Sequence, residues 1–108
     1  MINENDIVYI SGKMTGLPLL NFPLFHEAER YLRVTFLCEV INPARQPQRP
    51  TWYDYMRHDV NLLERATVIL LLPGWRNSRG AMIEYDLALM HGIRIIELAE
   101  LVPLREAA

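Results

Sequence analysis

The stretch LLLPGWRNSRGAMIEY, residues 70–85, decides the fold class. Its apolar beginning is typical of a buried strand, and the Pro-Gly pair at positions 73–74 ends that strand. A polar loop follows, and Ser78 opens a helix in which Glu84 stands among small and apolar neighbours. A strand, a glycine-containing loop and a helix in this order are how α/β proteins build nucleotide sites.

The same alternation of strand and helix patterns extends along the rest of the chain. Short apolar or β-branched runs predict four strands, at residues 7–10, 36–41, 67–72 and 93–96. Apolar residues at helical spacing predict three helices, over residues 23–33, 52–65 and 79–91. The alternation predicts one doubly wound α/β domain over residues 1–108, Rossmann- or flavodoxin-like, with a mostly parallel sheet and helices on both faces. Residues 67–72 are the most hydrophobic run, so we expect them at the sheet centre.

Local signals predict where these helices begin and end. Asn21 and Thr51 precede the first two helices at positions suited to capping, and Gly92 is placed for a left-handed C-cap after the third. Three prolines between positions 43 and 50 predict an irregular surface loop. The apolar residues of the tail either extend the sheet or dock on another subunit; they are Leu98, Leu101, Val102 and Leu104.

Composition narrows the class of protein. The chain has 108 residues, a formal charge of -2 and 51% hydrophobic residues, so nothing predicts broad nucleic-acid binding or attraction to an anionic membrane. No apolar run approaches the ~20 residues that span a bilayer, and the N-terminal residues lack a basic leader. Cys38 has no partner for an intrachain disulfide and is either a buried hydrophobe or a reactive thiol. We therefore expect a cytoplasmic protein.

The loops after the strands at 7–10 and 67–72 are expected to lie at one edge of the parallel sheet and share a crevice. They carry residues that allow close backbone approach or offer hydroxyls and a charge: Gly12, Gly16 and Gly80, together with Ser11, Lys13, Thr15 and Ser78. The amides that open the last helix favour an anion, and a phosphate is the natural occupant. The alternative is that the glycines only make turns and that Ser78 only caps a helix. Neither a Walker loop nor the dinucleotide fingerprint is present.

Two carboxylates are candidates for chemistry. The helical neighbours of Glu84 are Gly80, Ala81, Leu87 and Ala88, so no opposite charge pairs with it and it projects into a recess where desolvation raises its pKa. The alternatives are a solvated carboxylate or one half of a structural ion pair. Asp59 is less distinctive, because an exposed helix carboxylate beside Arg57 needs no further explanation.

Two aromatic residues lie near the predicted crevice. Tyr9 stands near the end of the first strand, where its hydroxyl either reaches the crevice or belongs to the core. Trp75 follows the third strand. It either forms an aromatic wall for a base or, like Trp52, closes the rim of the core. The three histidines show no metal-ligand spacing with Cys38, so we expect no metal site.

A set of motifs spread over residues 7–96 is similar to a known family. The matching positions are 9–16, 21–23, 41–44, Trp52, Tyr55, Met56, Asp59, 72–75, 78–81 and Glu84. They resemble a small, DUF4406-like family that is frequent in phages and prophages. That family in turn resembles the nucleoside 2-deoxyribosyltransferase superfamily, which includes 2′-deoxynucleoside 5′-monophosphate N-glycosidases.

The resemblance implies cleavage or transfer of the N-glycosidic bond of a 2′-deoxynucleoside or its 5′-monophosphate. Glu84 would be the nucleophile, positioned with the help of Tyr9, and Asp59 would bind or protonate the base. Ser78 and Gly80 would contact the phosphate or sugar. This chemistry needs no metal or organic cofactor, and family sites are completed across subunits, so the resemblance also implies a homo-oligomer.

The chain departs from the family pattern at two places. Thr15 stands where the monophosphate hydrolases carry an arginine, which leaves Lys13 as the nearest cation, and no residue in 97–108 matches the polar residue that completes a neighbouring site. These departures keep two alternatives open. One is a non-catalytic pocket for a nucleotide or a nucleotide-derived signal, and the other is a structural or host-interaction module.

Overall fold

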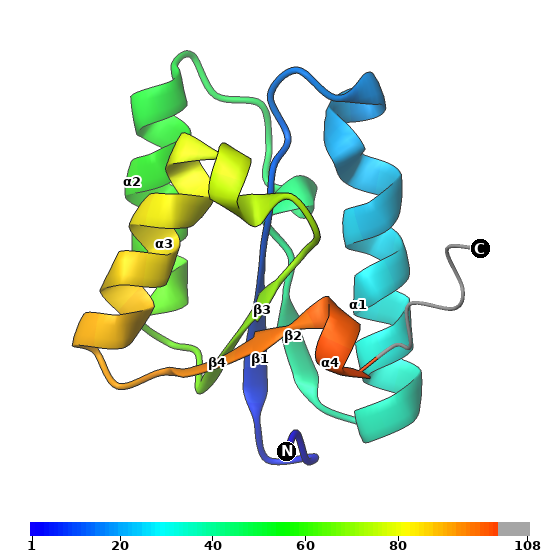
Figure 1. Ribbon diagram of the computed structural model, residues 1–108. Coiled ribbons are helices and arrows are strands. Elements are labelled where there is room, and N and C mark those ends of the chain that lie inside the picture. Colours follow the sequence, from blue (N-terminus) through cyan, green and yellow to red (C-terminus); the bar gives the residue numbers. More distant parts are fainter. Residues whose placement is uncertain (102–108) are drawn as a thin grey trace.

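A four-stranded parallel sheet forms the centre of the computed structural model, which describes residues 1–101 (Figure 1). Its strands lie in the order β2-β1-β3-β4 and are β1 (Ile7–Ser11), β2 (Glu39–Ile41), β3 (Val68–Leu71) and β4 (Arg94–Glu97). All three pairings are parallel, and Tyr9 of β1 stands opposite Ile41 of β2 and Ile69 of β3. The predicted α/β class is confirmed, and the hydrophobic β3 is one of the two interior strands.

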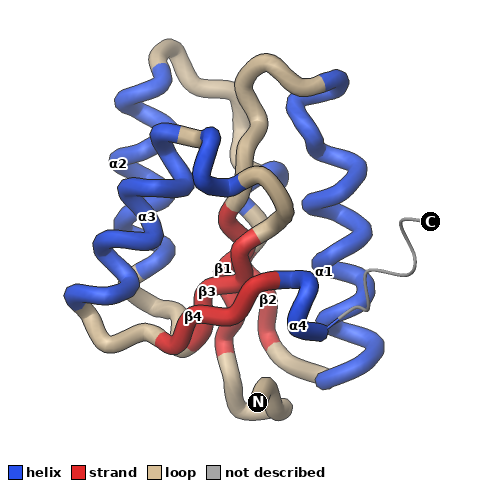
Figure 2. The backbone as a smooth tube through the Cα atoms, viewed as in Figure 1, coloured by secondary structure: helices blue, strands red, loops and turns tan. Residues whose placement is uncertain are grey.

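Helices cover both faces of this sheet, as predicted (Figure 2). Side chains alternate between faces along a strand. Accordingly Val8 and Ile10 of β1 pack with residues of α1 (Phe22–Phe36), whereas Tyr9 belongs to the cluster under α2 (Trp52–Leu63) and α3 (Arg79–Met90). The sheet thus separates two hydrophobic clusters. The longest of these helices, α1, has 15 residues, and none in the described part of the chain is long and apolar enough to cross a membrane.

The predicted helix ends are partly right. Thr51 caps α2 in a capping box with Asp54, and Gly92 is left-handed with a φ of 70°. Asn21 does not cap α1, because it is itself left-handed and its side chain turns away to donate a hydrogen bond to the carbonyl of Lys13 at 3.0 Å. It ends a short 3-10 turn, η1 (Pro18–Asn21), that joins the first loop to α1.

The predicted second strand began too early. Residues 36–38 are not in β2, because α1 continues through Phe36 and ends at Leu37, which has a φ of 57°. The ring of Phe36 packs edge-on against Tyr31, 6.0 Å between centroids, and against the α1 side of the core. A short apolar run fits a helix end as well as a strand. The proline-rich loop after β2 contains one 3-10 turn, η2 (Pro43–Arg45).

The described start of the tail, residues 98–101, turns back onto its own chain. Leu98 and Leu101 of the short helix α4 (Leu98–Leu101) pack against the cluster on the α1 side, and the Tyr31 hydroxyl donates to the carbonyl of Leu101 at 3.4 Å. These two leucines therefore do not extend the sheet, and both stay partly exposed. Val102 and Leu104 lie outside the described residues.

Candidate active site

A cavity of about 420 Å³ lies where the loops that follow β1, β2 and β3 meet. Its size is in the usual range of small-molecule sites, ~300–1,000 Å³. The walls are mostly apolar and aromatic, with a few polar groups; the lining residues are Ile10, Gly12, Met14, Thr15, Leu20, Phe22, Phe25, Pro43, Gln46, Gln48, Trp52, Tyr55, Met56, Asp59, Ser78, Gly80, Ala81 and Glu84. The cavity occupies the expected edge of the parallel sheet.

Glu84 is the most enclosed polar group of this cavity. Only 5% of the residue is exposed, and each carboxylate oxygen accepts a hydrogen bond, Oε2 from the Tyr9 hydroxyl at 2.6 Å and Oε1 from the Ser11 hydroxyl at 2.7 Å. Tyr9 and Ser11 are two residues apart on β1 and so point to the same face of the sheet, toward α3. The small neighbours at Gly80, Ala81 and Ala88 leave the recess that the sequence predicted.

The environment of Glu84 sets its protonation. Burial raises the pKa of Glu84 to about 7, and the hydrogen bonds from Tyr9 and Ser11 oppose this shift because they favour the charged form. Burial and the charges of Glu84 and Asp59 raise the pKa of Tyr9 well above its usual value, so its hydroxyl stays a donor. The expected rise in the pKa of Glu84 is thus borne out, and the proton of Tyr9 remains in place to hold the carboxylate.

Asp59 lies on α2, is buried, and lines the same cavity. Burial and the charge of Glu84 raise the pKa of Asp59 to about 8, and Arg49 acts in the opposite direction. Two carboxyl groups that share a desolvated site do not readily ionise together. Since Glu84 accepts two hydroxyl donors, it is the group better able to carry the negative charge, and Asp59 is the group that keeps a proton near neutral pH.

The predicted loop residues separate into two groups. Gly12, Thr15, Ser78 and Gly80 line the cavity, and Ser11 reaches it through Glu84. Lys13 and Gly16 belong to the same loop but are not part of the lining. Gly12 also has a packing role, because a Cβ there would meet the Cβ of Leu72 at 2.9 Å. Ser78 caps α3 by accepting a hydrogen bond from the Ala81 amide at 3.1 Å.

Trp75 is not an aromatic wall of this cavity. Only 5% of the residue is exposed, its ring lies 4.7 Å from that of Tyr85, and its Nε1 donates to Glu97 at 3.4 Å. The turn η3 (Trp75–Asn77) folds its side chain into the core between the sheet and α3. The prediction of a base-binding role for Trp75 is therefore corrected, and its alternative, a place in the core, holds.

The aromatic lining comes instead from α1 and α2, from side chains that were not among the predicted site residues. Trp52, Tyr55 and Met56 line the cavity from α2, and Phe22 and Phe25 line it from α1. The signal for the first group was present in the sequence. Trp52, Tyr55, Met56 and Asp59 recur at intervals of three and four residues and so share one helix face.

A second group of cavity residues had no such signal. Gln46 and Gln48 belong to the proline-rich loop after β2, which has no periodicity. The amide Nε2 of Gln46 donates to Asp59 Oδ1, and Nε of Arg49 donates to Gln46 Oε1 at 2.7 Å. The backbone amide of Arg49 donates to the Tyr55 hydroxyl at 2.9 Å, which ties the same loop to α2.

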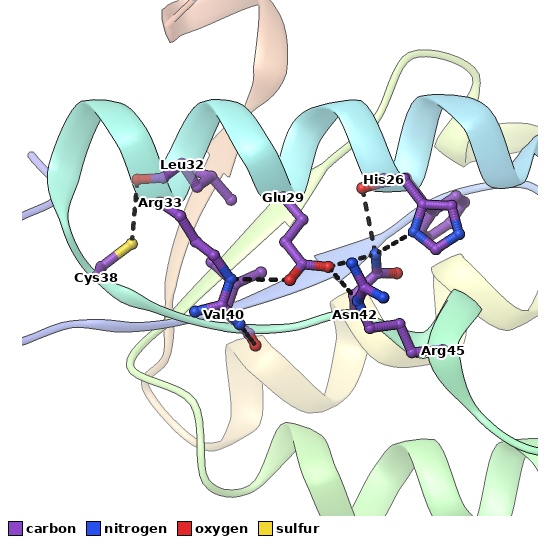
Figure 3. A network of polar contacts seen from close by, with 9 residues as sticks. His26, Glu29, Leu32, Arg33, Cys38, Val40, Asn42 and Arg45 are labelled. Atoms are coloured by element: carbon purple, nitrogen blue, oxygen red, sulfur yellow. Dashed lines mark hydrogen bonds and ion pairs between the residues drawn. The ribbon is translucent and has the colours of Figure 1, made fainter.

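Hydrogen bonds to Glu29 of α1 hold the start of this loop, at Asn42 and Arg45 (Figure 3). Its buried carboxylate accepts hydrogen bonds from Arg33 Nε at 2.8 Å, Arg45 Nε at 2.6 Å and Asn42 Nδ2 at 2.9 Å. Burial acts to raise the pKa of Glu29, but these hydrogen bonds outweigh it and lower the pKa to about 2. The loop therefore leaves β2 in a fixed direction that brings Gln46 to Asp59. Among residues 1–101, no group of three or more His, Cys, Asp or Glu side chains gathers to hold a metal ion.

Comparison with known families adds one finding. The family model described as a domain of unknown function (DUF4406) matches residues 6–97, which covers β1 to β4 and every polar group of the cavity. No curated protein matches the chain.

Proposed function

Since this chain belongs to the DUF4406 family, whose description names no activity, we propose its function from the site itself: it cleaves or transfers the N-glycosidic bond of a 2′-deoxynucleoside. One observation carries the proposal. Buried Glu84 accepts a hydrogen bond on each carboxylate oxygen and lines the same cavity as Asp59, whose pKa burial and the charge of Glu84 raise to about 8. A nucleophilic carboxylate paired with a carboxylic acid is the equipment of retaining glycosidases.

In the proposed reaction a Glu84 oxygen attacks C1′ of the sugar as the bond between C1′ and the base nitrogen breaks. The electron pair of that bond leaves with the base, and Asp59 donates its proton to the departing base. The product is a glycosyl ester on Glu84. Water, or a second base, then attacks C1′ and releases the sugar while Asp59 takes up a proton again.

The hydroxyls of Tyr9 and Ser11 serve this chemistry by holding the Glu84 carboxylate in one orientation. Their hydrogen bonds, at 2.6 Å and 2.7 Å, also favour the ionised form that acts as nucleophile. The resemblance of the sequence to the nucleoside 2-deoxyribosyltransferase superfamily, through Tyr9, Asp59 and Glu84, agrees with these roles.

The cavity walls favour a nucleoside over its 5′-monophosphate. The rings of Trp52, Tyr55 and Phe22 offer flat apolar surfaces for a base. Within the described part of the chain, no lysine or arginine is among the lining residues, and the negative charge of the interior is that of Glu84. Among these lining residues a phosphate dianion would find no cationic side chain to pair with.

We place the enzyme in the cytoplasm, where nucleosides occur and where the buried free thiol of Cys38 stays reduced. We also propose a homo-oligomer. On α3, Leu89 and Met90 are 54% and 80% exposed, and such apolar side chains are suited to a contact between copies. Light scattering of the purified protein tests this; a monomer at all concentrations would remove it.

The second candidate is a pocket that binds a nucleoside, a nucleotide or a nucleotide-derived signal without turnover. It is favoured by the complete hydrogen bonding of Glu84, because a carboxylate that only supports the pocket would be satisfied in the same way. The two candidates differ in the wild-type protein. Under the first it releases or exchanges a base and Glu84→Gln abolishes this turnover, whereas under the second it binds its ligand without any turnover.

The test is chromatography of the purified protein incubated with a panel of deoxynucleosides and their 5′-monophosphates, with and without an acceptor base. Glu84→Gln removes the nucleophile, and Asp86→Asn is the matched control because Asp86 is an exposed carboxylate on the same helix. Base release or exchange that persists in Asp86→Asn and disappears in Glu84→Gln supports the proposal. Turnover that survives in Glu84→Gln contradicts it.

A further inference from the structure

The amide of Gln46 lies between Arg49 and the carboxyl group of Asp59. Nε of Arg49 donates to Gln46 Oε1 at 2.7 Å, and Gln46 Nε2 donates to Asp59 Oδ1. An arginine side chain has only donors, so the amide oxygen must face Arg49 and the NH2 group must face Asp59. The orientation of the Gln46 amide is therefore set by the hydrogen-bond network.

This arrangement decides which oxygen of Asp59 carries the proton. Oδ1 already accepts an N–H from Gln46, and in a neutral carboxyl group the carbonyl oxygen is a better acceptor than the hydroxyl oxygen. The proton of the neutral carboxyl group therefore resides on Oδ2. Because Asp59 lines the cavity, Oδ2 is the oxygen left to act on a bound ligand.

The same arrangement keeps a cation from pairing directly with Asp59. Within the described residues, Glu84 from α3 and Arg49 from the loop act on the charge of Asp59, Asp59 acts on Tyr9 of β1, and Tyr55 of α2 lines the same cavity. Glu84 favours the protonated form of Asp59, whereas Arg49 favours the ionised form. Gln46 engages the Nε of Arg49 through a neutral amide, so that the guanidinium is held without forming an ion pair with Asp59.

We propose that Gln46, held by Arg49, is a positioning residue that fixes the proton of Asp59 on Oδ2, where it is donated to the leaving base. This inference rests on the proposed function. The inference gives Gln46 and Arg49 of the proline-rich loop a role in the proposed reaction. It also explains why Glu29, Asn42 and Arg45 anchor the start of that loop (Figure 3).

The decisive variant is Gln46→Glu. Its carboxylate keeps an acceptor for Arg49, so the loop stays tied, but it presents an acceptor instead of a donor to Asp59 Oδ1. The Asp59 proton must then turn toward residue 46, away from the ligand. We expect kcat to fall at least about tenfold with KM changed less than about threefold, as for partial loss of a general acid. The added negative charge is also expected to move the basic limb of the pH–rate profile upward.

Gln48→Glu is the matched control, because it places the same charge in the lining of the same cavity on a residue without a hydrogen bond to Asp59. The readout shared by both variants is the titration of the Asp59 carboxyl carbon, followed by NMR of protein labelled in its aspartates. We expect a larger upward displacement of the midpoint in Gln46→Glu than in Gln48→Glu. Equal displacements, or a kcat of Gln46→Glu within twofold of wild type, would overturn the inference.

A second variant, Gln46→Leu, and the Asp59 titration keep the inference testable if Gln46→Glu does not fold or if the protein has no glycosidic activity. Gln46→Leu removes the donor without adding charge, and it is expected to lose kcat in the same direction. If the wild-type protein releases no base from any substrate, the proposed glycosidic chemistry fails. The Asp59 titration still decides whether Gln46 controls that carboxyl group.

Discussion

Removing the Tyr9 hydroxyl is the most informative single change to the site. Tyr9→Phe keeps the fully buried ring in the core and deletes one of the two hydrogen bonds to Glu84. A hydrogen bond to a charged group contributes about 1.5–3 kcal/mol, and one pH unit corresponds to about 1.4 kcal/mol, so the Glu84 midpoint is expected to rise by about one to two pH units. The pKa of Glu84 is already about 7 in the wild-type protein, so at pH 7 this carboxyl group is ionised in roughly half of the molecules.

The expected loss of activity follows from the ionised fraction. At pH 7 that fraction falls from about one half to between one tenth and one hundredth, so kcat/KM falls about 5- to 50-fold. At pH 9 most of the difference disappears, because Glu84 ionises in both proteins. The acid limb of the kcat/KM profile therefore moves upward in the variant.

The assay is base release measured from pH 5 to pH 9 for wild type, Tyr9→Phe and Tyr53→Phe. Tyr53 is the matched control, since it loses the same hydroxyl from a side chain that is 62% exposed on α2. NMR titration of the Glu84 carboxyl carbon follows the same quantity without any substrate. An unchanged Glu84 midpoint in Tyr9→Phe would refute the reasoning, whatever the effect on rate.

Four further predictions follow from the same contacts. The folded-state pKa of Glu84, about 7, lies above its ordinary value of 4.5, so the folded protein loses stability as the pH rises through this window. In urea unfolding, the free energy of unfolding of Glu84→Gln relative to wild type should therefore rise by up to about 3 kcal/mol between pH 5 and pH 8. A difference that stays constant with pH would contradict this. The pKa of Glu29 is lowered to about 2, so its contribution is present above about pH 4.5 and is lost as the pH falls toward 2. Glu29→Gln should cost about 2 kcal/mol at pH 7, less than the full shift because Arg33 and Arg45 are half-exposed, and the cost should shrink in acid. Gly12→Ala should lower stability by about 1–3 kcal/mol in thermal unfolding, because the new Cβ meets Leu72; an unchanged melting temperature would show that the strand and loop yield freely. In calorimetry with Glu84→Gln, a deoxynucleoside should bind more tightly than its 5′-monophosphate, and the reverse order would show that a cation reaches the phosphate.

Much of the fold follows from local patterns in the sequence. The alternation of apolar runs with helical spacing predicts four strands and three helices, and the parallel sheet with helices on both faces follows from that order. The errors fall at element ends. Residues 36–38 belong to the end of α1 and the turn after it, and Asn21 binds the Lys13 carbonyl, because tertiary contacts decide between conformations that the local sequence leaves nearly equal.

Some residues of the candidate site could likewise be predicted from local patterns, and others could not. The small residues around Glu84 on one helix predict its recess, and the two-residue spacing of Tyr9 and Ser11 places both hydroxyls on the face that Glu84 meets. Gln46 and Arg49 were not predictable. Gln46 joins a loop without periodicity to Asp59, 13 residues further along the chain, and Arg49 acts through Gln46. Trp75 was misplaced because a loop tryptophan fits a cavity wall and a core position equally well until the turn that carries it is known.

The central claim is that Glu84 forms a covalent bond to C1′ of a deoxyribosyl group. Intact-protein mass spectrometry after rapid acid quenching of the enzyme with a deoxynucleoside in excess tests it most directly, with peptide mapping to locate any added mass. The account predicts an increase equal to one deoxyribosyl group on the peptide that contains Glu84, and no increase in Glu84→Gln. Base release without an adduct in wild type, together with base release by Glu84→Gln, would contradict it.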